Sequence, residues 1–336
     1  MGNQTILNEL FLSGLSDIPA LQLPLFLFFL LIYLLTLIWN LLIISLIVSD
    51  SHLHTPMYFF LGNLASLDLC FSSITVPQML FDLLTQRRKI TITACMTQVF
   101  FFIFFASSES FLLAVMSYDR YTAICQPLHY IQIMNWKVCL TLASIVWCLG
   151  SSYSLVHTLC ALKLTFCESA IVQSFFCDLP QLLQISCSDI YINILLIFVL
   201  GGFLVAGSLT LTILPYVYIF KTVLKIQVKG KRSKVFSTCS SHLTVVFIFY
   251  FSGSFDYFRP DTNNHYAADK VLPVFYTVIV PLLNPLIYSL RNQDSRKAFK
   301  CSYSGVSYIT FLISNRSFDQ ENNKRALGIA VSVLKS

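Results

Sequence analysis

Several charged residues lie inside or at the ends of long apolar runs, where they could do chemistry. Asp119 and Arg120 are adjacent at the end of one run, so the arginine can pair with the neighbouring carboxylate. Glu109 lies within the same run, and Asp68 lies within the run before it. Two like charges in a low-dielectric environment cannot both stay ionised without a counter-ion. Either the two carboxyls share a proton, or a cation such as sodium lies between them, and we favour sodium.

A second polar pattern, Asn284-Pro285 followed by Tyr288, interrupts the last apolar run. Proline removes one backbone hydrogen bond from a helix, and the neighbouring Asn284 side chain can satisfy the freed carbonyl. A helix weakened in this way can act as a hinge, and the simpler alternative is a static kink. The sequence contains no zinc-ligand cluster, nucleophile elbow or phosphate-binding loop, so we do not expect an enzyme.

The composition is that of a membrane protein. Of the 336 residues, 56% are hydrophobic and 11% are charged. A soluble domain carries about 25% charged residues, so this chain cannot cover a water-facing surface of its size. The net charge of +6 is small, and no segment combines basic and aromatic residues as a nucleic-acid surface does. We therefore expect contact with membrane lipid and no nucleic-acid partner.

Seven apolar runs are each long enough to cross a bilayer. Backbone groups in lipid must be satisfied within the chain, which predicts helices rather than strands. The expected fold class is therefore an all-α membrane protein with a bundle of seven transmembrane helices. The runs cover about residues 23–48, 57–81, 96–118, 138–159, 192–220, 237–258 and 269–290.

Lysine and arginine predict the orientation, because they are enriched in cytoplasmic loops. They cluster after the fifth and seventh runs and are absent before the first run, so the amino terminus should be extracellular. The exception is Arg87, Arg88 and Lys89, which this topology places outside. The same topology makes Asn3, which begins an Asn-x-Thr triplet, an N-glycosylation acceptor.

Five stretches together resemble the olfactory receptors, a branch of the rhodopsin-like G-protein-coupled receptors. Each stretch lies at a span boundary where this family carries a motif, and the resemblance covers about residues 1–300. The stretches are residues 53–61 (LHTPMYFFL), 116–125 (MSYDRYTAIC), 176–178 (FCD), 234–243 (KVFSTCSSHL) and 281–292 (PLLNPLIYSLRN).

The resemblance also implies a domain organisation. Residues 1–22 would be the extracellular amino terminus, and residues 23–290 the seven-transmembrane receptor domain. Residues 291–300 would form a short cytoplasmic amphipathic helix. Residues 301–336 depart most from the family, and we expect them to be an atypical, disordered cytoplasmic tail.

The resemblance gives the polar patterns a role in signalling. It implies that Asp119 holds Arg120 in the resting state, and that activation frees Arg120 to contact a heterotrimeric G protein of the stimulatory, olfactory type. Tyr216 and Tyr288 would swing inward to support the arginine, as in similar receptors. The residues that the resemblance assigns to this switch are Asp119, Arg120, Tyr121, Tyr216, Asn284, Pro285 and Tyr288.

The resemblance also implies two disulfides on the oxidising side of the membrane. One would join Cys95 to Cys177 and tie the second outer loop over the bundle, and the other would join Cys167 to Cys187. The sequence alone allows three pairings of these four cysteines, and Cys160 is a competitor for them.

The resemblance places a ligand pocket between the third, fifth, sixth and seventh spans. Phe102, Ile103, Ala106 and Ser107 recur at helical spacing on the third span, so they share one face. Phe102 stands where amine receptors carry an aspartate, which favours small, mostly apolar and neutral ligands. The residues expected to complete the pocket are Leu200, Leu204, Gly253, Ser254, Tyr257, Val274 and Thr277.

The expected function is that of an odorant receptor in the plasma membrane, which binds small neutral volatile ligands and raises cAMP through its G protein. The alternative is a receptor of the same fold for a non-odorant small metabolite outside the olfactory epithelium. A transporter or channel is disfavoured, because there is no internal repeat and Asp68 with Glu109 is the only feature that suggests a pathway.

Overall fold

The computed structural model describes residues 9–166, 171–225, 229–257 and 273–291. Met1–Tyr288 form one compact unit, and Ser289–Ser336 form a second unit that is described only as far as residue 291. Asn3, the helix expected after residue 291 and the tail therefore lie outside the described residues.

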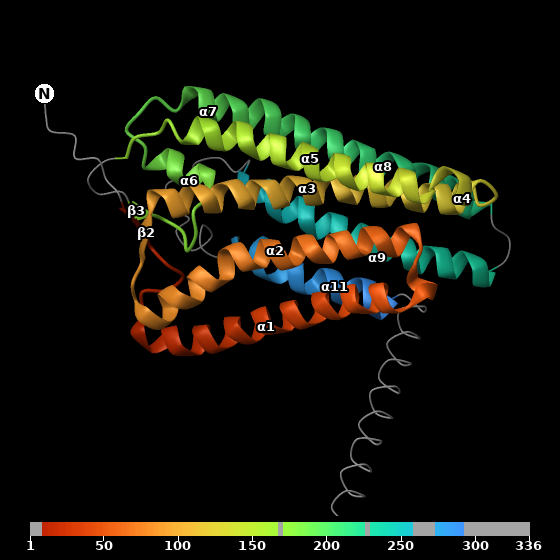
Figure 1. Cartoon of the computed structure of the whole chain (residues 1–336), viewed down its shortest axis with the longest axis horizontal. Coiled ribbons are helices and arrows are strands. Elements are labelled where there is room, and N and C mark those ends of the chain that lie inside the picture. Colours follow the sequence, from red (N-terminus) through yellow and green to blue (C-terminus); the bar gives the residue numbers. More distant parts are fainter. Residues whose placement is uncertain (1–8, 167–170, 226–228, 258–272, 292–336) are drawn as a thin grey trace, which may run out of the picture. The chain divides into compact units, whose positions relative to one another are not determined.

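Long helices lie side by side in the first unit (Figure 1), and α3 contacts α2, α5, α8 and α9. Among the described residues, five helices are long and apolar enough to cross a bilayer, and shorter apolar helices at Cys239–Gly253 and Phe275–Ile287 match the sixth and seventh predicted runs. The main helix in each of these seven segments is, in chain order, α1 (Pro19–Ser49), α2 (Pro56–Thr85), α3 (Ile92–Cys125), α5 (Trp136–Ala161), α8 (Gly202–Leu224), α9 (Lys229–Tyr257) and α11 (Val280–Arg291).

Short helical segments connect or extend the long ones. A single 3₁₀ turn, η1, leads into α2, and two π-helical segments, η2 and η3, run directly into α8 and α11. These segments are η1 (Ser51–Leu53), α4 (Tyr130–Ile133), α6 (Leu179–Gln184), α7 (Tyr191–Leu196), η2 (Ile197–Gly201) and η3 (Phe275–Ile279).

Residues at the helix starts account for where several helices begin. Proline stands in the first turn of α1 and of α2, where its missing N–H costs no helical hydrogen bond. Thr91 caps α3 by accepting a hydrogen bond from the Ala94 N–H at 3.2 Å. Asn135 caps α5 in the same way, with the Val138 N–H at 3.1 Å. These caps satisfy backbone donors that have no partner inside the helix.

The central helix of the bundle is α3. In its most apolar stretch 67% of residues are buried, compared with 28% in α1 and 6% in the continuous helix Tyr191–Leu224. The exposed side chains of that outer helix include Phe203, which is 80% exposed, and Leu211, which is 59% exposed. Such an apolar surface is unfavourable in water but matches lipid tails, as expected for a membrane-spanning bundle.

A small three-stranded sheet, which the sequence analysis did not predict, lies at the outer end. Strand β1 (Glu9–Leu12) pairs antiparallel with β2 (Lys89–Thr91) and parallel with β3 (Ile171–Val172). The sheet therefore joins the amino terminus to the first and second outer loops. Leu10 and Leu12 of β1 point inward and are almost fully buried.

The same sheet accounts for the basic residues that the topology places outside. The Arg88 guanidinium donates to the Ser13 carbonyl at 2.6 Å and to the Ser16 carbonyl at 2.7 Å, and it pairs with Asp17. Lys89 pairs with Glu9 at 3.1 Å. Arg88 and Lys89 thus hold the amino-terminal segment in place, so their position outside the membrane has a structural cause.

Helices α3 and α5 approach each other closely at Gly150. A Cβ atom at this position would lie 2.0 Å from the Ser108 Oγ atom and 3.1 Å from the Phe104 carbonyl oxygen. The Ser107 hydroxyl also donates to the Gly150 carbonyl at 3.3 Å. Small residues permit such close contacts between membrane helices, so Gly150 sets the α3–α5 distance.

We predict that Gly150→Ala lowers the stability of the folded protein by about 1–3 kcal/mol, because the added methyl group forces α3 and α5 apart. Thermal unfolding of the detergent-solubilised protein measures the effect. Gly207→Ala is the matched control, since nothing lies within 4 Å of a Cβ atom there. Equal unfolding temperatures for the two variants would contradict the prediction.

Candidate functional site

A cavity of about 140 Å³ lies between α3, α5, the η2–α8 helix, α9 and η3. Its wall is almost entirely aromatic and aliphatic. The lining residues are Phe71, Phe102, Ile103, Ala106, Ser107, Ser110, Tyr153, His157, Leu179, Ile197, Gly201, Leu204, Val205, Phe249, Tyr250, Gly253 and Tyr276.

The cavity brings together six of the residues that the sequence analysis assigned to the pocket: Phe102, Ile103, Ala106, Ser107, Leu204 and Gly253.

Three other assigned residues, Leu200, Val274 and Thr277, are absent from its lining. The Thr277 side chain is fully buried and donates to the Pro273 carbonyl at 2.7 Å. The side chains of Ser254 and Tyr257 lie outside the described residues.

The lining also contains residues that the sequence analysis did not assign. Tyr153 and His157 come from α5, which was not expected to face the pocket, and Leu179 comes from the second outer loop. Tyr153 and His157 are four residues apart in an apolar helix, and this spacing on one face was the available signal.

A disulfide between Cys95 and Cys177 ties the second outer loop to the start of α3, with 5.4 Å between the Cα atoms. The Cys177 N–H donates to the Gln98 side-chain oxygen at 2.8 Å, and the Gln98 amide donates to the Ile74 carbonyl at 2.9 Å. The ring of Phe176 lies 5.1 Å from the ring of Phe102, a cavity residue. The loop therefore packs against the cavity wall.

The other cysteines agree with the expected pattern where they are described. Cys187 is disulfide-bonded, and its expected partner Cys167 lies outside the described residues. Cys160, the competitor, is a free thiol.

Asp68 and Glu109 face each other across the buried Asn284 side chain. The Asn284 amide nitrogen donates to the Asp68 Oδ1 atom at 2.9 Å and to the Glu109 Oε1 atom at 3.2 Å. The three side chains are at most 3% exposed. The Asp68 Oδ2 atom is buried without a hydrogen-bond partner. A buried carboxylate oxygen without a donor carries a desolvation cost that a bound cation would offset.

This arrangement corrects our interpretation of Asn284. We expected its side chain to satisfy the carbonyl that Pro285 frees, which is that of Pro281 in the preceding turn. The Asn40 side chain of α1 makes this bond instead, at 3.1 Å, while Asn284 binds the two carboxylates. The proline therefore creates a contact between α1 and α11.

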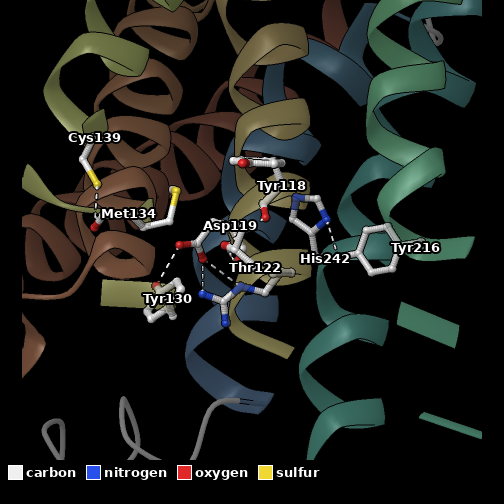
Figure 2. Close-up of polar contacts among 9 residues, drawn as sticks. Tyr118, Asp119, Thr122, Tyr130, Met134, Cys139, Tyr216 and His242 are labelled. Carbon is white, nitrogen blue, oxygen red and sulfur yellow. Dashed lines mark hydrogen bonds and ion pairs between the residues drawn. The ribbon is translucent and has the colours of Figure 1, made fainter. Parts of the chain in front are cut away.

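At the cytoplasmic end of α3, Asp119 forms an ion pair with Arg120. The Tyr130 hydroxyl of α4 donates to the Asp119 Oδ1 atom at 2.8 Å, and Figure 2 shows Tyr130 pointing at this carboxylate. Burial raises the pKa of Tyr130, and the Asp119 charge raises it further, so Tyr130 stays a protonated donor. Asp119 is 0% exposed, and both of its oxygens are satisfied.

A second contact lies beside this ion pair. The Tyr216 hydroxyl of α8 and the His242 Nδ1 atom of α9 are 2.8 Å apart, and Figure 2 shows the two rings facing each other. Tyr121 packs its ring against Tyr118 and Tyr218, with centroids 6.3 Å and 5.9 Å away. The side chain of Tyr288 lies outside the described residues.

The bundle, the cavity next to a disulfide-linked loop and the cytoplasmic ion pair define a seven-helix receptor of the rhodopsin fold. The structure superimposes on squid rhodopsin with a TM-score of 0.62, over 87% of each chain at 19% sequence identity. Because the sequence identity is this low, the match is evidence for the fold alone.

Sequence comparison gives the family. The olfactory receptor family profile matches residues 29–304. The chain is 48% identical to olfactory receptor 5B12 of Homo sapiens, over 89% of this chain and 96% of that protein. It is also 48% identical to olfactory receptor 8G17 of Mus musculus, over 89% of this chain and 98% of the relative. The chain belongs to the olfactory receptor family, whose members are multi-pass G-protein-coupled receptors of the plasma membrane and not enzymes.

The contact between α1 and α11 can be used to test whether Asn40 replaces the helical hydrogen bond that Pro285 removes. We predict that Asn40→Leu lowers stability by about 1–3 kcal/mol, because it leaves the Pro281 carbonyl buried without a donor. The cost should shrink when Pro285→Ala is added, because the new backbone N–H can bond to the same carbonyl. Thermal unfolding of the single and double variants forms a double-mutant cycle. Strictly additive effects would rule the interpretation out.

Proposed function

We propose that this receptor binds small, mostly apolar, neutral volatile ligands in the cavity and activates a stimulatory, olfactory-type G protein that raises cAMP. The observation that carries the proposal is the apolar cavity itself, which lies within the helix bundle. Phe102, on the α3 wall, is 3% exposed and packs on aromatic rings, so it offers no charge to an ammonium group. Simple amines are therefore poor ligands.

The cavity also predicts a modest affinity. An odorant that buries on the order of 200 Å² of apolar surface gains about 5 kcal/mol. One hydrogen bond adds about 0.5–1.5 kcal/mol, and the cost of association offsets part of the total. Dissociation constants near the micromolar range or weaker follow, with selectivity spread over shape and one polar contact.

The cytoplasmic residues support a role in G-protein coupling. Arg120 is held by Asp119, which Tyr130 holds in turn, while Tyr216 and His242 join α8 to α9 beside it. A switch of this kind needs two states, and releasing Arg120 from Asp119 would free its donors for a G-protein partner.

We predict that Arg120→Ala abolishes the cAMP response to ligand and leaves ligand binding intact. Cells expressing the receptor with the olfactory G protein are exposed to a panel of volatile alcohols, aldehydes, ketones, esters and amines, and cAMP is recorded. Arg232→Ala, at an exposed cytoplasmic arginine whose charge lies over the Phe236 ring, is the control at equal surface expression. Normal signalling by Arg120→Ala would reject the switch, and the absence of a response to every volatile compound at normal surface expression would favour the alternative receptor class.

We also propose that a sodium ion binds between Asp68 and Glu109. Both carboxylates lie within reach of the same Asn284 nitrogen, and the unpartnered Asp68 oxygen supplies a ligand of the type that hard cations prefer. A bound sodium would offset the repulsion between the two carboxylates.

We predict that sodium raises the unfolding temperature of the detergent-solubilised receptor relative to N-methylglucamine at equal ionic strength, and that Asp68→Asn removes this difference. Glu9→Gln is the control, because Glu9 is a surface carboxylate that pairs with Lys89. A stability that responds to pH but not to sodium would show instead that the two carboxyls share a proton.

A further inference from the structure

One face of α5 presents two polar rings to the cavity. Tyr153 and His157 both line it, and their ring centroids are 4.6 Å apart. His157 is 2% exposed, and its Nε2 atom is buried without a hydrogen-bond partner. Among the described residues that line the cavity, His157 alone has a buried polar atom without a partner.

Three hydroxyl groups in the cavity wall already use their protons within the protein. Ser107 donates to the Ile103 carbonyl at 2.7 Å, and Ser110 donates to the Ala106 carbonyl at 3.2 Å. The Tyr250 hydroxyl donates to the Ser208 Oγ atom at 2.8 Å. These three oxygens can still accept a hydrogen bond from a ligand, but they have no free proton to donate.

This division separates two classes of neutral ligand. An alcohol carries its own proton and can donate to any of the three hydroxyl oxygens. An aldehyde, ketone or ester has only acceptors and needs a donor from the wall. A neutral imidazole has one N–H donor and one acceptor nitrogen, so His157 can supply that donor.

We propose that His157 is the polar anchor for carbonyl ligands, with its ring N–H donating to the carbonyl oxygen. This inference rests on the proposed function, because it assigns the polar contact within the same ligand cavity. Binding also removes a cost for the receptor, since a buried polar atom without a partner is unfavourable and the carbonyl satisfies it. The specificity determinant for carbonyl compounds thus lies on α5.

The size of the cavity indicates suitable probes. Its volume of about 140 Å³ is close to that of an engineered protein cavity of about 150 Å³ that binds benzene. Benzaldehyde, benzyl alcohol and toluene share this ring and differ only in the polar group, which is an acceptor, a donor with an acceptor, or neither.

The experiment compares the three probes on the wild-type receptor, His157→Phe, which keeps a flat ring against Tyr153, and His157→Gln, which keeps an N–H donor. We expect His157→Phe to raise the benzaldehyde concentration for half-maximal cAMP by about tenfold. Benzyl alcohol and toluene should change by about twofold or less, and His157→Gln should recover most of the benzaldehyde response. Ser152→Ala, at an exposed position of the same helix whose hydroxyl donates to the Cys148 carbonyl at 2.8 Å, is the control and should leave the benzaldehyde response unchanged.

Equal losses for all three probes, or no loss for benzaldehyde, would overturn the inference and show that His157 only packs in the wall. Thermal unfolding of the detergent-solubilised receptor with benzaldehyde separates this failure from a failure of the proposed function. If benzaldehyde raises the unfolding temperature of the wild type more than that of His157→Phe but raises no cAMP, the result supports His157 as the anchor and rejects the signalling role. Benzaldehyde that stabilises the two proteins equally, or stabilises neither, overturns the anchor.

Discussion

The structure depends on one constraint: a polar group inside the bilayer must find its partner within the protein, because lipid offers none. Pro285 shows the constraint at work. It leaves the Pro281 carbonyl without a helical donor, and Asn40 supplies one from α1. Asn284 is then left to bind Asp68 and Glu109, which connects α11 to α2 and α3. A break in one helix thereby becomes a network that joins four helices.

At the outer end water is available, and the connections change in kind. There the chain uses a small sheet, surface ion pairs and a disulfide to fix its loops. Exposed ion pairs contribute about 0–1 kcal/mol each, so Lys89 with Glu9 adds little alone. Arg88 differs, because its guanidinium also binds two backbone carbonyls and so orders the segment that leads into α1. The outer basic residues are thus part of the fold and do not argue against the topology.

Much of this molecule could be predicted from the sequence, because lipid imposes long apolar runs and family motifs mark their ends. The spans follow from the apolar runs, and the Cys95–Cys177 bridge was implied by the resemblance to the family. The partner of the Pro281 carbonyl could not be predicted, since Asn40 is distant in sequence and only the packing of α1 brings it near. The outer sheet was also missed, because β1 and β3 are too short to show a strand pattern.

Some residues of the pocket could be predicted from local sequence patterns, whereas others depend on how the helices pack. Helical periodicity on α3 selected residues that do line the cavity, whereas the face of α5 depends on how closely that helix approaches α3 at Gly150. The same constraint on buried polar groups explains the proposed role of His157, because a ligand in the cavity can pair with its buried Nε2 atom, which has no partner within the protein.

The cavity and the cytoplasmic ion pair share two structural elements. Tyr250 of α9 lines the cavity and hydrogen-bonds to Ser208 of α8. On the same two helices, Tyr216 and His242 form the bond beside Arg120. Tyr216 lies eight residues from Ser208 and His242 lies eight residues from Tyr250, which is about 12 Å at 1.5 Å per residue. A ligand that changes the Tyr250 contact therefore acts on the same α8–α9 pair that the Tyr216–His242 bond holds together. Coupling across the membrane then needs only a shift between two rigid helices, each tied to α3.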